Sequence, residues 1–347
     1  MQSHLSIPAN RRRLNTPPSG SAGEAFYWTS PISIVMDLRS KFENPAQPVI
    51  LHELIPPKLG APAELDENLS YIQELTGIAD AINVPEIREE TRQGARRTRL
   101  PERMEPRVFA QAIHGSCGMA TVINRVTVHE AHAEQRQWLK ESYDDFGIRN
   151  LILVGGESRK TQYPGPSVLE AAALSREAGV EFLLGGITIP SRTHEVMRIR
   201  QKYHQGLNFF TTQVLLDSND VVDLIQGLNG LDVRIFLSFA PISDSRDVEF
   251  LRWLGVDVPK NVAWSIAQVD EPGKAVEKTV TQACKILTDV FDHLPPHPPG
   301  LGINVEQISR RNHGPARRML GMLGDFYRRL LLAHYSGSAR VVHAASR

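Results

Sequence analysis

The sequence predicts a (β/α)8 barrel, a TIM barrel, with an N-terminal extension and a C-terminal helix. Eight short runs rich in apolar and β-branched residues recur along the chain, and stretches with helical periodicity separate most of them. Runs that are apolar on both faces and alternate with amphipathic helices indicate parallel strands buried on both sides. Eight repeats of this kind fit a closed barrel better than an open, doubly wound sheet.

The strands are expected at 49–54, 80–84, 120–126, 150–154, 181–187, 208–216, 232–240 and 300–308. The clearest helices are expected at 63–77, 131–147 and 274–294. In the second of these, Trp138, Leu139, Tyr143 and Phe146 recur at helical spacing, and Gly147 follows as a C-cap.

The length of 347 residues corresponds to one barrel with two appendages. Residues 1–46 are expected to form a disordered extension, because the first 23 contain no acid, carry three consecutive arginines and are rich in serine and proline. A transit peptide is the alternative. Residues 47–314 form the predicted barrel. Residues 315–347 are expected to form a helix and tail that close the barrel bottom or mediate self-association.

Composition excludes several classes of protein. The chain has 39 basic and 39 acidic side chains, which argues against nucleic acid as a partner. Two cysteines, Cys117 and Cys284, are too few for a disulfide scaffold or a four-cysteine zinc site, and the histidines lack metal-ligand spacing, so no metal is expected. No apolar run approaches the ~20 residues that span a bilayer. We expect a cytoplasmic protein with a small-molecule partner, either a monomer or a homo-oligomer.

The segment 86–107 is rich in arginine and holds several acids. It follows the second predicted strand, so it should lie on the barrel face that carries active sites. It is either a solvated charged surface or an anion site for a cofactor pyrophosphate or a substrate carboxylate.

Polar residues that interrupt predicted strands are candidates for chemistry. Glu53 lies in an apolar run before two prolines, where burial of a carboxyl group suits a general acid or requires a structural salt bridge. Gly155 and Gly156 end the fourth strand and allow a ligand to approach the backbone, and Glu157 follows them. Gln213 in the sixth strand can read the amide edge of a heterocycle. In the eighth strand, 306–307 form a similar polar interruption.

The order of these residues resembles the methylenetetrahydrofolate reductase family. The run HELIPPK at 52–58 is similar to its E-F-F-P-P-K motif, 155–157 falls at its Arg-Gly-Asp, and Thr212, Gln213 and Asp217 match its Thr-Gln and aspartate. The similarity extends from about residue 49 to 307.

The resemblance implies a role for each matched residue. Glu53 would be the catalytic proton donor to the folate nitrogen, and Glu157, Gln213 and Thr127 would bind the substrate; Thr127 belongs to Arg-Val-Thr at the place of the family's His-Leu-Thr. On the cofactor side the implied residues are Gly155, Gly156, His194 and Lys202. The implied cofactors are FAD and the hydride donor NAD(P)H, with tetrahydrofolate as substrate.

Several positions depart from the family pattern, mainly on its flavin side. Gly155 replaces a flavin-binding arginine, Pro85 a threonine, and Ile189 a tyrosine, while the aromatic after strand seven aligns near Ser245. The eighth strand, GINVEQIS, is more similar to shorter, divergent members, some of which work without flavin. The presence of FAD therefore stays open.

The expected activity is that of an oxidoreductase of one-carbon metabolism, which reduces 5,10-methylenetetrahydrofolate to 5-methyltetrahydrofolate with NAD(P)H. One alternative is a tetrahydrofolate-dependent methyltransferase or demethylase. Another is a non-catalytic pterin-binding or scaffold subunit.

Overall fold

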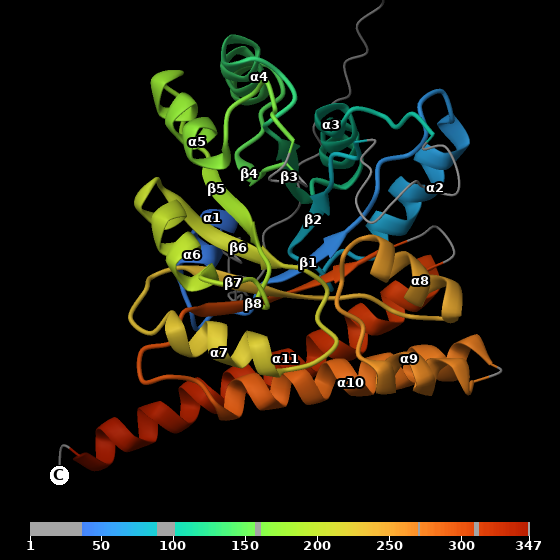
Figure 1. Ribbon diagram of the computed structural model, residues 1–347, viewed down its shortest axis with the longest axis vertical. Helices are drawn as coiled ribbons and strands as arrows, with labels where there is room; N and C mark the ends of the chain where they lie inside the picture. Colours follow the sequence, from blue (N-terminus) through green and yellow to red (C-terminus); the bar gives the residue numbers. More distant parts are fainter. Residues whose placement is uncertain (1–36, 89–100, 157–160, 270, 309–311, 346–347) are drawn as a thin grey trace, which may run out of the picture. The chain divides into compact units, whose positions relative to one another are not determined.

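The computed structural model describes residues 37–88, 101–156, 161–269, 271–308 and 312–345. It confirms the predicted barrel: eight parallel strands close in the order β1 to β8, and β8 pairs with β1 (Figure 1). The strands are β1 (Ile50–Glu53), β2 (Ala81–Val84), β3 (Ala120–Val126), β4 (Asn150–Val154), β5 (Leu183–Thr188), β6 (Leu207–Thr212), β7 (Arg234–Phe239) and β8 (Gly300–Glu306). Each overlaps its predicted run.

Helices follow the strands in alternation and form the outer layer (Figure 1). They are α2 (Pro62–Gln73), α3 (Pro106–Cys117), α4 (His132–Asp144), α5 (Val168–Glu177), α6 (Glu195–His204), α7 (Asn219–Gly227), α10 (Pro272–Asp292) and α11 (His313–Ala345). Two further helices, α8 (Ser245–Trp253) and α9 (Lys260–Ala267), lie in the connection between β7 and α10. The predicted C-terminal helix is α11, which packs on α10 and β8 and thus belongs to the barrel wall.

Apolar side chains fill the lower interior of the barrel. Leu51, Val122 and Ile152 pack there with Phe209 and Phe236. Two strand glycines make room for the aromatic rings: a Cβ on Gly185 would lie 2.4 Å from the Phe209 ring, and one on Gly302 would lie 2.5 Å from the Phe236 ring. Because this layer is filled, a ligand can enter only above it, at the carboxyl ends of the strands.

Helix α1 (Leu38–Glu43) covers the amino ends of the strands, although its residues fall in the predicted extension. Phe42 packs on Phe209 and Phe236 with ring centroids 4.9 Å apart in each case. Arg234, which is 1% exposed, donates from Nε to the Phe42 carbonyl at 2.9 Å and from Nη2 to the Lys41 carbonyl at 3.0 Å. The barrel therefore begins about ten residues before the predicted boundary.

His52 belongs to β1 and is fully buried, with polar contacts to β8 and α2. Its Nδ1 lies 2.9 Å from the Val305 carbonyl, and its Nε2 lies 3.1 Å from the Tyr71 hydroxyl. Burial lowers the pKa of the imidazole from 6.5 to about 4, so the ring is neutral in the folded protein at pH 7.

This burial predicts a loss of stability in acid. Between pH 6.5 and about 4 the unfolded chain binds a proton at His52 that the folded chain does not, so the free energy of unfolding should fall by about 3 kcal/mol as the pH drops through this window. Urea unfolding at a series of pH values measures it. His52→Gln should have a shallower pH dependence than the wild type, and equal slopes would contradict the assignment.

No helix in the described ranges is both long enough and apolar enough to cross a membrane.

Candidate functional site

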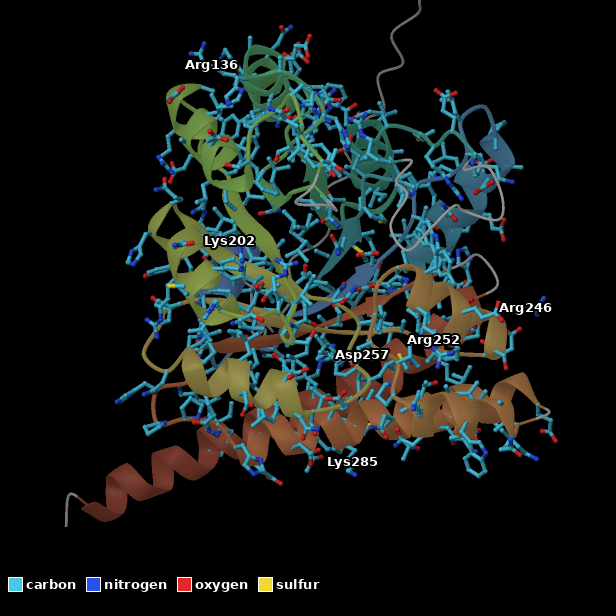
Figure 2. The ribbon with its side chains drawn as sticks, viewed as in Figure 1. Arg136, Lys202, Arg246, Arg252, Asp257 and Lys285 are labelled. Atoms are coloured by element: carbon cyan, nitrogen blue, oxygen red, sulfur yellow. The ribbon has the colours of Figure 1, made fainter. Side chains whose placement is uncertain are left out.

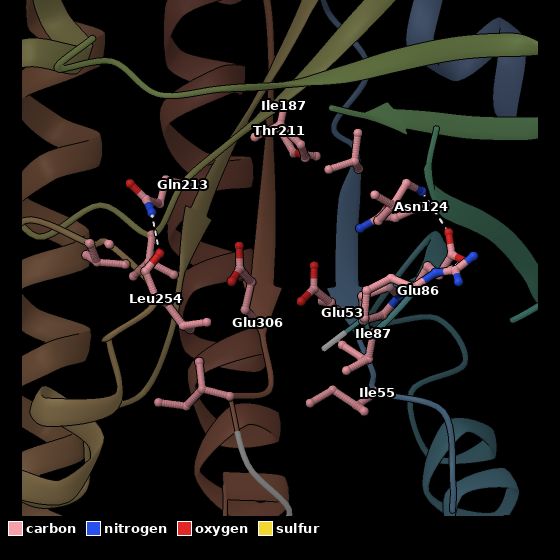
Figure 3. A pocket seen from close by; sticks show the side chains of 18 of the residues that line it. Glu53, Ile55, Glu86, Ile87, Asn124, Ile187, Thr211, Gln213, Leu254 and Glu306 are labelled. Carbon is pink, nitrogen blue, oxygen red and sulfur yellow. Dashed lines mark hydrogen bonds and ion pairs between the residues drawn. The ribbon is translucent and has the colours of Figure 1, made fainter. Parts of the chain in front are cut away.

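A cavity of about 900 Å³ opens at the carboxyl ends of the strands (Figure 3). The floor of the cavity is polar and includes Glu53, Asn124 and Glu306, which lie at or near the carboxyl ends of β1, β3 and β8. One wall is apolar and includes Phe250 and Leu254. A volume of this size and mixed lining are typical of small-molecule sites. Within the described residues, no group of three or more histidine, cysteine, aspartate or glutamate side chains is placed to hold a metal ion.

Glu53 and Glu306 lie side by side in the floor. They are paired residues across the β1–β8 ladder, and both side chains extend into the cavity (Figure 3). Each accepts a hydrogen bond from a buried asparagine: Asn83 Nδ2 donates to Glu53 Oε2 at 2.9 Å, and Asn304 Nδ2 donates to Glu306 Oε1 at 3.4 Å. Two carboxyl groups thus share one edge of the site, and each accepts a hydrogen bond from an asparagine amide.

Asn124 adds an amide to the same floor. It is 8% exposed, and its Oδ1 has no hydrogen-bond partner within the described residues. Figure 3 shows the side chain reaching into the cavity between Glu53 and Glu86. A buried amide oxygen without a partner carries a free-energy cost, which a ligand or an ordered water molecule would relieve.

Gln213 follows β6 and lines the same cavity. Its backbone N–H donates to the Thr188 carbonyl at 3.0 Å, and its side-chain Nε2 donates to the Leu254 carbonyl at 3.3 Å. The second bond joins β6 to the end of α8, so Gln213 links the barrel to the apolar wall.

An ion network supports the side of the site next to β2 and β3. Arg125, which is 4% exposed, donates to Glu86 at 2.9 Å, to Glu130 at 2.8 Å and to Gln135 at 3.1 Å. Arg88 joins the same two glutamates. Glu86 and Arg88 belong to the arginine-rich segment and line the cavity, as predicted for its position; 89–100 lie outside the described residues.

Lys202 lies on α6 (Figure 2) and is one of the residues that line the cavity. Its Nζ donates to the Ile187 carbonyl at 2.7 Å, and burial lowers the pKa of the ammonium group to about 8. His194, predicted on the same side, is exposed and absent from the lining; it caps α6 in the left-handed region with φ of 63°. The structure therefore brings Lys202 into the site but not His194.

Of the other predicted positions, some line the cavity and others do not. Gly155 and Gly156 line the cavity, but the place of a Gly156 side chain is taken by Tyr163, since a Cβ there would lie 2.2 Å from its ring. Thr127 is fully buried but does not line the cavity, and its hydroxyl donates to the Pro166 carbonyl at 2.8 Å. Glu157 lies outside the described residues.

These positions do not fit a flavin site. The ammonium of Lys202 already donates to a strand carbonyl, His194 is outside the cavity, and Tyr163 occupies the space beside Gly156. Three of the flavin-side positions that depart from the family pattern, Pro85, Gly155 and Ile189, line the cavity and supply no cationic or aromatic group.

Sequence reasoning overlooked the three asparagines of the barrel interior. Asn83, Asn124 and Asn304 are each less than a tenth exposed. A signal was present: all three follow an isoleucine in strands β2, β3 and β8, so the same Ile-Asn pair recurs where an apolar residue is expected. The apolar wall from Phe250 to Leu254 was also overlooked, because α8 and α9 do not belong to the repeat of strand and helix.

The fold and the site define a (β/α)8 barrel with a cavity at its mouth. No family model matches the sequence, and no curated protein matches it either. Among solved structures, an uncharacterised protein from Clostridium thermocellum that binds two copies of 5-methyl-5,6,7,8-tetrahydrofolic acid is similar, with a TM-score of 0.63, 17% identity, and coverage of 80% of this chain and 95% of that one.

Two further structures are more distant. A dihydropteroate synthetase has a TM-score of 0.41 at 13% identity and covers 79% of this chain and 94% of its own. A tryptophan synthase from M. tuberculosis has a TM-score of 0.44 at 12% identity, over 82% and 94%. At 17% identity, the likeness to the clostridial protein is one of fold alone.

Proposed function

We propose that the protein binds a reduced folate in the cavity at the barrel mouth and reduces 5,10-methylenetetrahydrofolate to 5-methyltetrahydrofolate with NAD(P)H. The observation that carries the proposal is Glu53, a carboxyl group at the end of β1 that lines the cavity and accepts a hydrogen bond from Asn83. The resemblance in motif order and the tetrahydrofolate bound by the similar clostridial barrel support a folate ligand.

A pterin ring presents neighbouring N–H donors and a carbonyl acceptor along one edge. Carboxylates accept such donors, and an amide side chain provides both a donor and an acceptor. Glu53, Asn124 and Gln213 all line the cavity. Strand pairing holds the backbones of Glu53 and Asn124, and the Gln213 N–H donates to the Thr188 carbonyl. Phe250 and Leu254 offer an apolar surface to the benzoyl part of a folate.

Glu53 would act as the general acid. Its proton goes to the folate nitrogen N10, the bond between that nitrogen and the bridging carbon breaks, and the carbon is left as an iminium on N5. A reduced nicotinamide supplies the hydride that converts the iminium to a methyl group. The reaction consumes one hydride from NAD(P)H and one proton from Glu53. A proton from solvent then reprotonates the Glu53 carboxylate.

Tetrahydrofolate-dependent methyl transfer or demethylation is the second candidate. It is favoured by the lining at Gly155 and Ile189, where the family's flavin contacts are replaced by groups that cannot make them. This reaction needs no hydride donor. A non-catalytic folate-binding subunit would share the cavity and lack both reactions.

Calorimetric titration with tetrahydrofolate, followed by an assay of NAD(P)H oxidation with 5,10-methylenetetrahydrofolate, tests the proposal. Binding with oxidation supports the reductase. Binding without oxidation favours methyl transfer or a binding subunit, and the absence of binding contradicts a folate site altogether.

Gln213→Leu is expected to weaken tetrahydrofolate binding about tenfold, because it removes a donor and an acceptor from the cavity wall. Gln111→Leu is the matched control, since Gln111 is exposed on α3 and does not line the cavity. Equal affinities for the two variants would remove Gln213 from the binding site.

A further inference from the structure

Three asparagines, Asn83, Asn124 and Asn304, form a polar layer inside the barrel, above its apolar lower interior. In β2 and β3 the asparagine comes two residues after an interior residue, which is Ala81 in β2 and Val122 in β3. In β8 it comes two residues after the glycine that makes room for an aromatic ring. Because residues two apart on a strand share a face, all three amides point into the barrel.

Each of these amides leaves its acceptor oxygen unused. Asn83 donates from Nδ2 to Glu53 at 2.9 Å, and Asn304 donates from Nδ2 to the Ser238 hydroxyl at 3.1 Å. The Oδ1 atom of all three asparagines has no hydrogen-bond partner within the described residues. A buried acceptor without a donor costs free energy, so three in one layer indicate that N–H or O–H groups reach this layer from outside the protein.

Asn124 differs from the other two asparagines in its access to the cavity. It is 8% exposed and lines the cavity, whereas Asn83 and Asn304 are 1% exposed and fully buried, respectively, and do not line it. Its side chain reaches into the cavity between Glu53 and Glu86 (Figure 3). Of these three unpartnered oxygens, the Oδ1 of Asn124 is therefore the one that an N–H group of a bound small molecule can reach directly.

We propose that Asn124 is a specificity-determining residue, whose Oδ1 accepts a hydrogen bond from the 2-amino group of a bound pterin. This proposal rests on the folate site proposed above. It places the amino-pyrimidine end of the folate deepest in the barrel, at the polar layer, with the benzoyl part further out. A site with a buried hydrogen-bonding group rejects an analogue that lacks the matching group, because its own group then stays unpaired.

Two ligands test this assignment by calorimetry: tetrahydrofolate, and its analogue with a methyl group in place of the 2-amino group. The wild type should bind tetrahydrofolate about tenfold more tightly than the analogue. Asn124→Leu should bind the two ligands with similar affinity, because the acceptor that distinguishes them is gone.

Asn68→Leu is the matched control, since Asn68 is a buried amide that lines the same cavity from α2. This variant should keep the wild-type preference for tetrahydrofolate. A preference that survives in Asn124→Leu, or that is already absent in the wild type, would overturn the role of Asn124. Loss of the preference in Asn68→Leu alone would assign the 2-amino group to Asn68 instead.

A second measurement needs no ligand and tests whether Asn124 has a structural role. Asn124→Leu removes a buried acceptor that has no protein donor, so its urea midpoint should equal or exceed that of the wild type. Asn304→Leu is the comparison, because it removes the bonds to Ser238 and Glu306 and its midpoint should fall. An equal fall in the two variants would assign Asn124 to the fold and overturn the proposal.

The role of Asn124 and the reductase function can fail separately. If the preference for tetrahydrofolate depends on Asn124 but NAD(P)H is not oxidised, the reductase function is wrong and the role of Asn124 is right. If NAD(P)H is oxidised and the preference does not depend on Asn124, the reverse holds. If the wild type binds neither ligand, both the folate site and the role of Asn124 are wrong.

Discussion

Replacing Glu53 with glutamine is expected to lower kcat for reduction of 5,10-methylenetetrahydrofolate by about 10²–10⁴-fold, the usual contribution of a general acid. Glutamine has the same size and still accepts the hydrogen bond from Asn83, so the fold and the shape of the cavity should persist. It carries no proton that it can release to the folate nitrogen. The loss should therefore fall on kcat, with little change in tetrahydrofolate affinity.

Steady-state kinetics and calorimetry on the same preparation separate these two effects. Glu53→Asp serves as the comparison, because it retains a carboxyl group one methylene further from the ligand and should have intermediate activity. Undiminished turnover in Glu53→Gln would exclude proton donation by this residue. A parallel loss of binding would instead assign Glu53 to substrate recognition.

Replacing Arg234 with methionine is expected to lower the free energy of unfolding by about 3–5 kcal/mol, which is typical when a buried charged hydrogen-bonding group is removed from its partners. The guanidinium donates to the carbonyls of Lys41, Phe42, Asn44, Gln47 and Leu301. Most of these oxygens belong to α1 and the turn after it. Methionine fills a similar volume and leaves them without this donor.

Urea denaturation gives the change in stability, and Arg176→Met is the matched control. Arg176 also donates to backbone, through the Gln205 carbonyl at 2.6 Å, but at an exposed position, so its loss should cost less than about 1 kcal/mol. The helix α1 should become susceptible to proteolysis in Arg234→Met before the rest of the barrel does. Equal stability of the two variants would show that Arg234 does not anchor α1.

Periodicity was sufficient to predict the barrel, because strands buried on both faces are continuously apolar and recur with helices between them. It missed helix α1 for a physical reason. Helix α1 is six residues long and its burial depends on Phe42 and on the distant Arg234, so no local pattern reveals it. The helices α8 and α9 interrupt the repeat and were likewise not predicted.

The site was predictable where a polar residue interrupted an apolar strand. Glu53 and Gln213 both line the cavity, as expected from their positions at strand ends. The same reasoning does not hold for Thr127 and His194, which do not line the cavity. The Thr127 hydroxyl donates to the Pro166 carbonyl, and His194 is exposed at the start of α6. The pairing of Glu53 with Glu306 depends on closure of the ring. The sequence pattern indicates that the ring closes, but it does not specify the register of β1 against β8.

The pairing of β1 with β8 also has a consequence for the order in which the protein is made. Residues 53 and 306 meet only at the seam of the ring, so most of the chain must be synthesised before the floor of the cavity can exist. Contacts of such large sequence separation form slowly, because closing a long loop costs conformational entropy. Helix content can therefore develop well before the site does, and ligand binding during refolding would report closure of the ring.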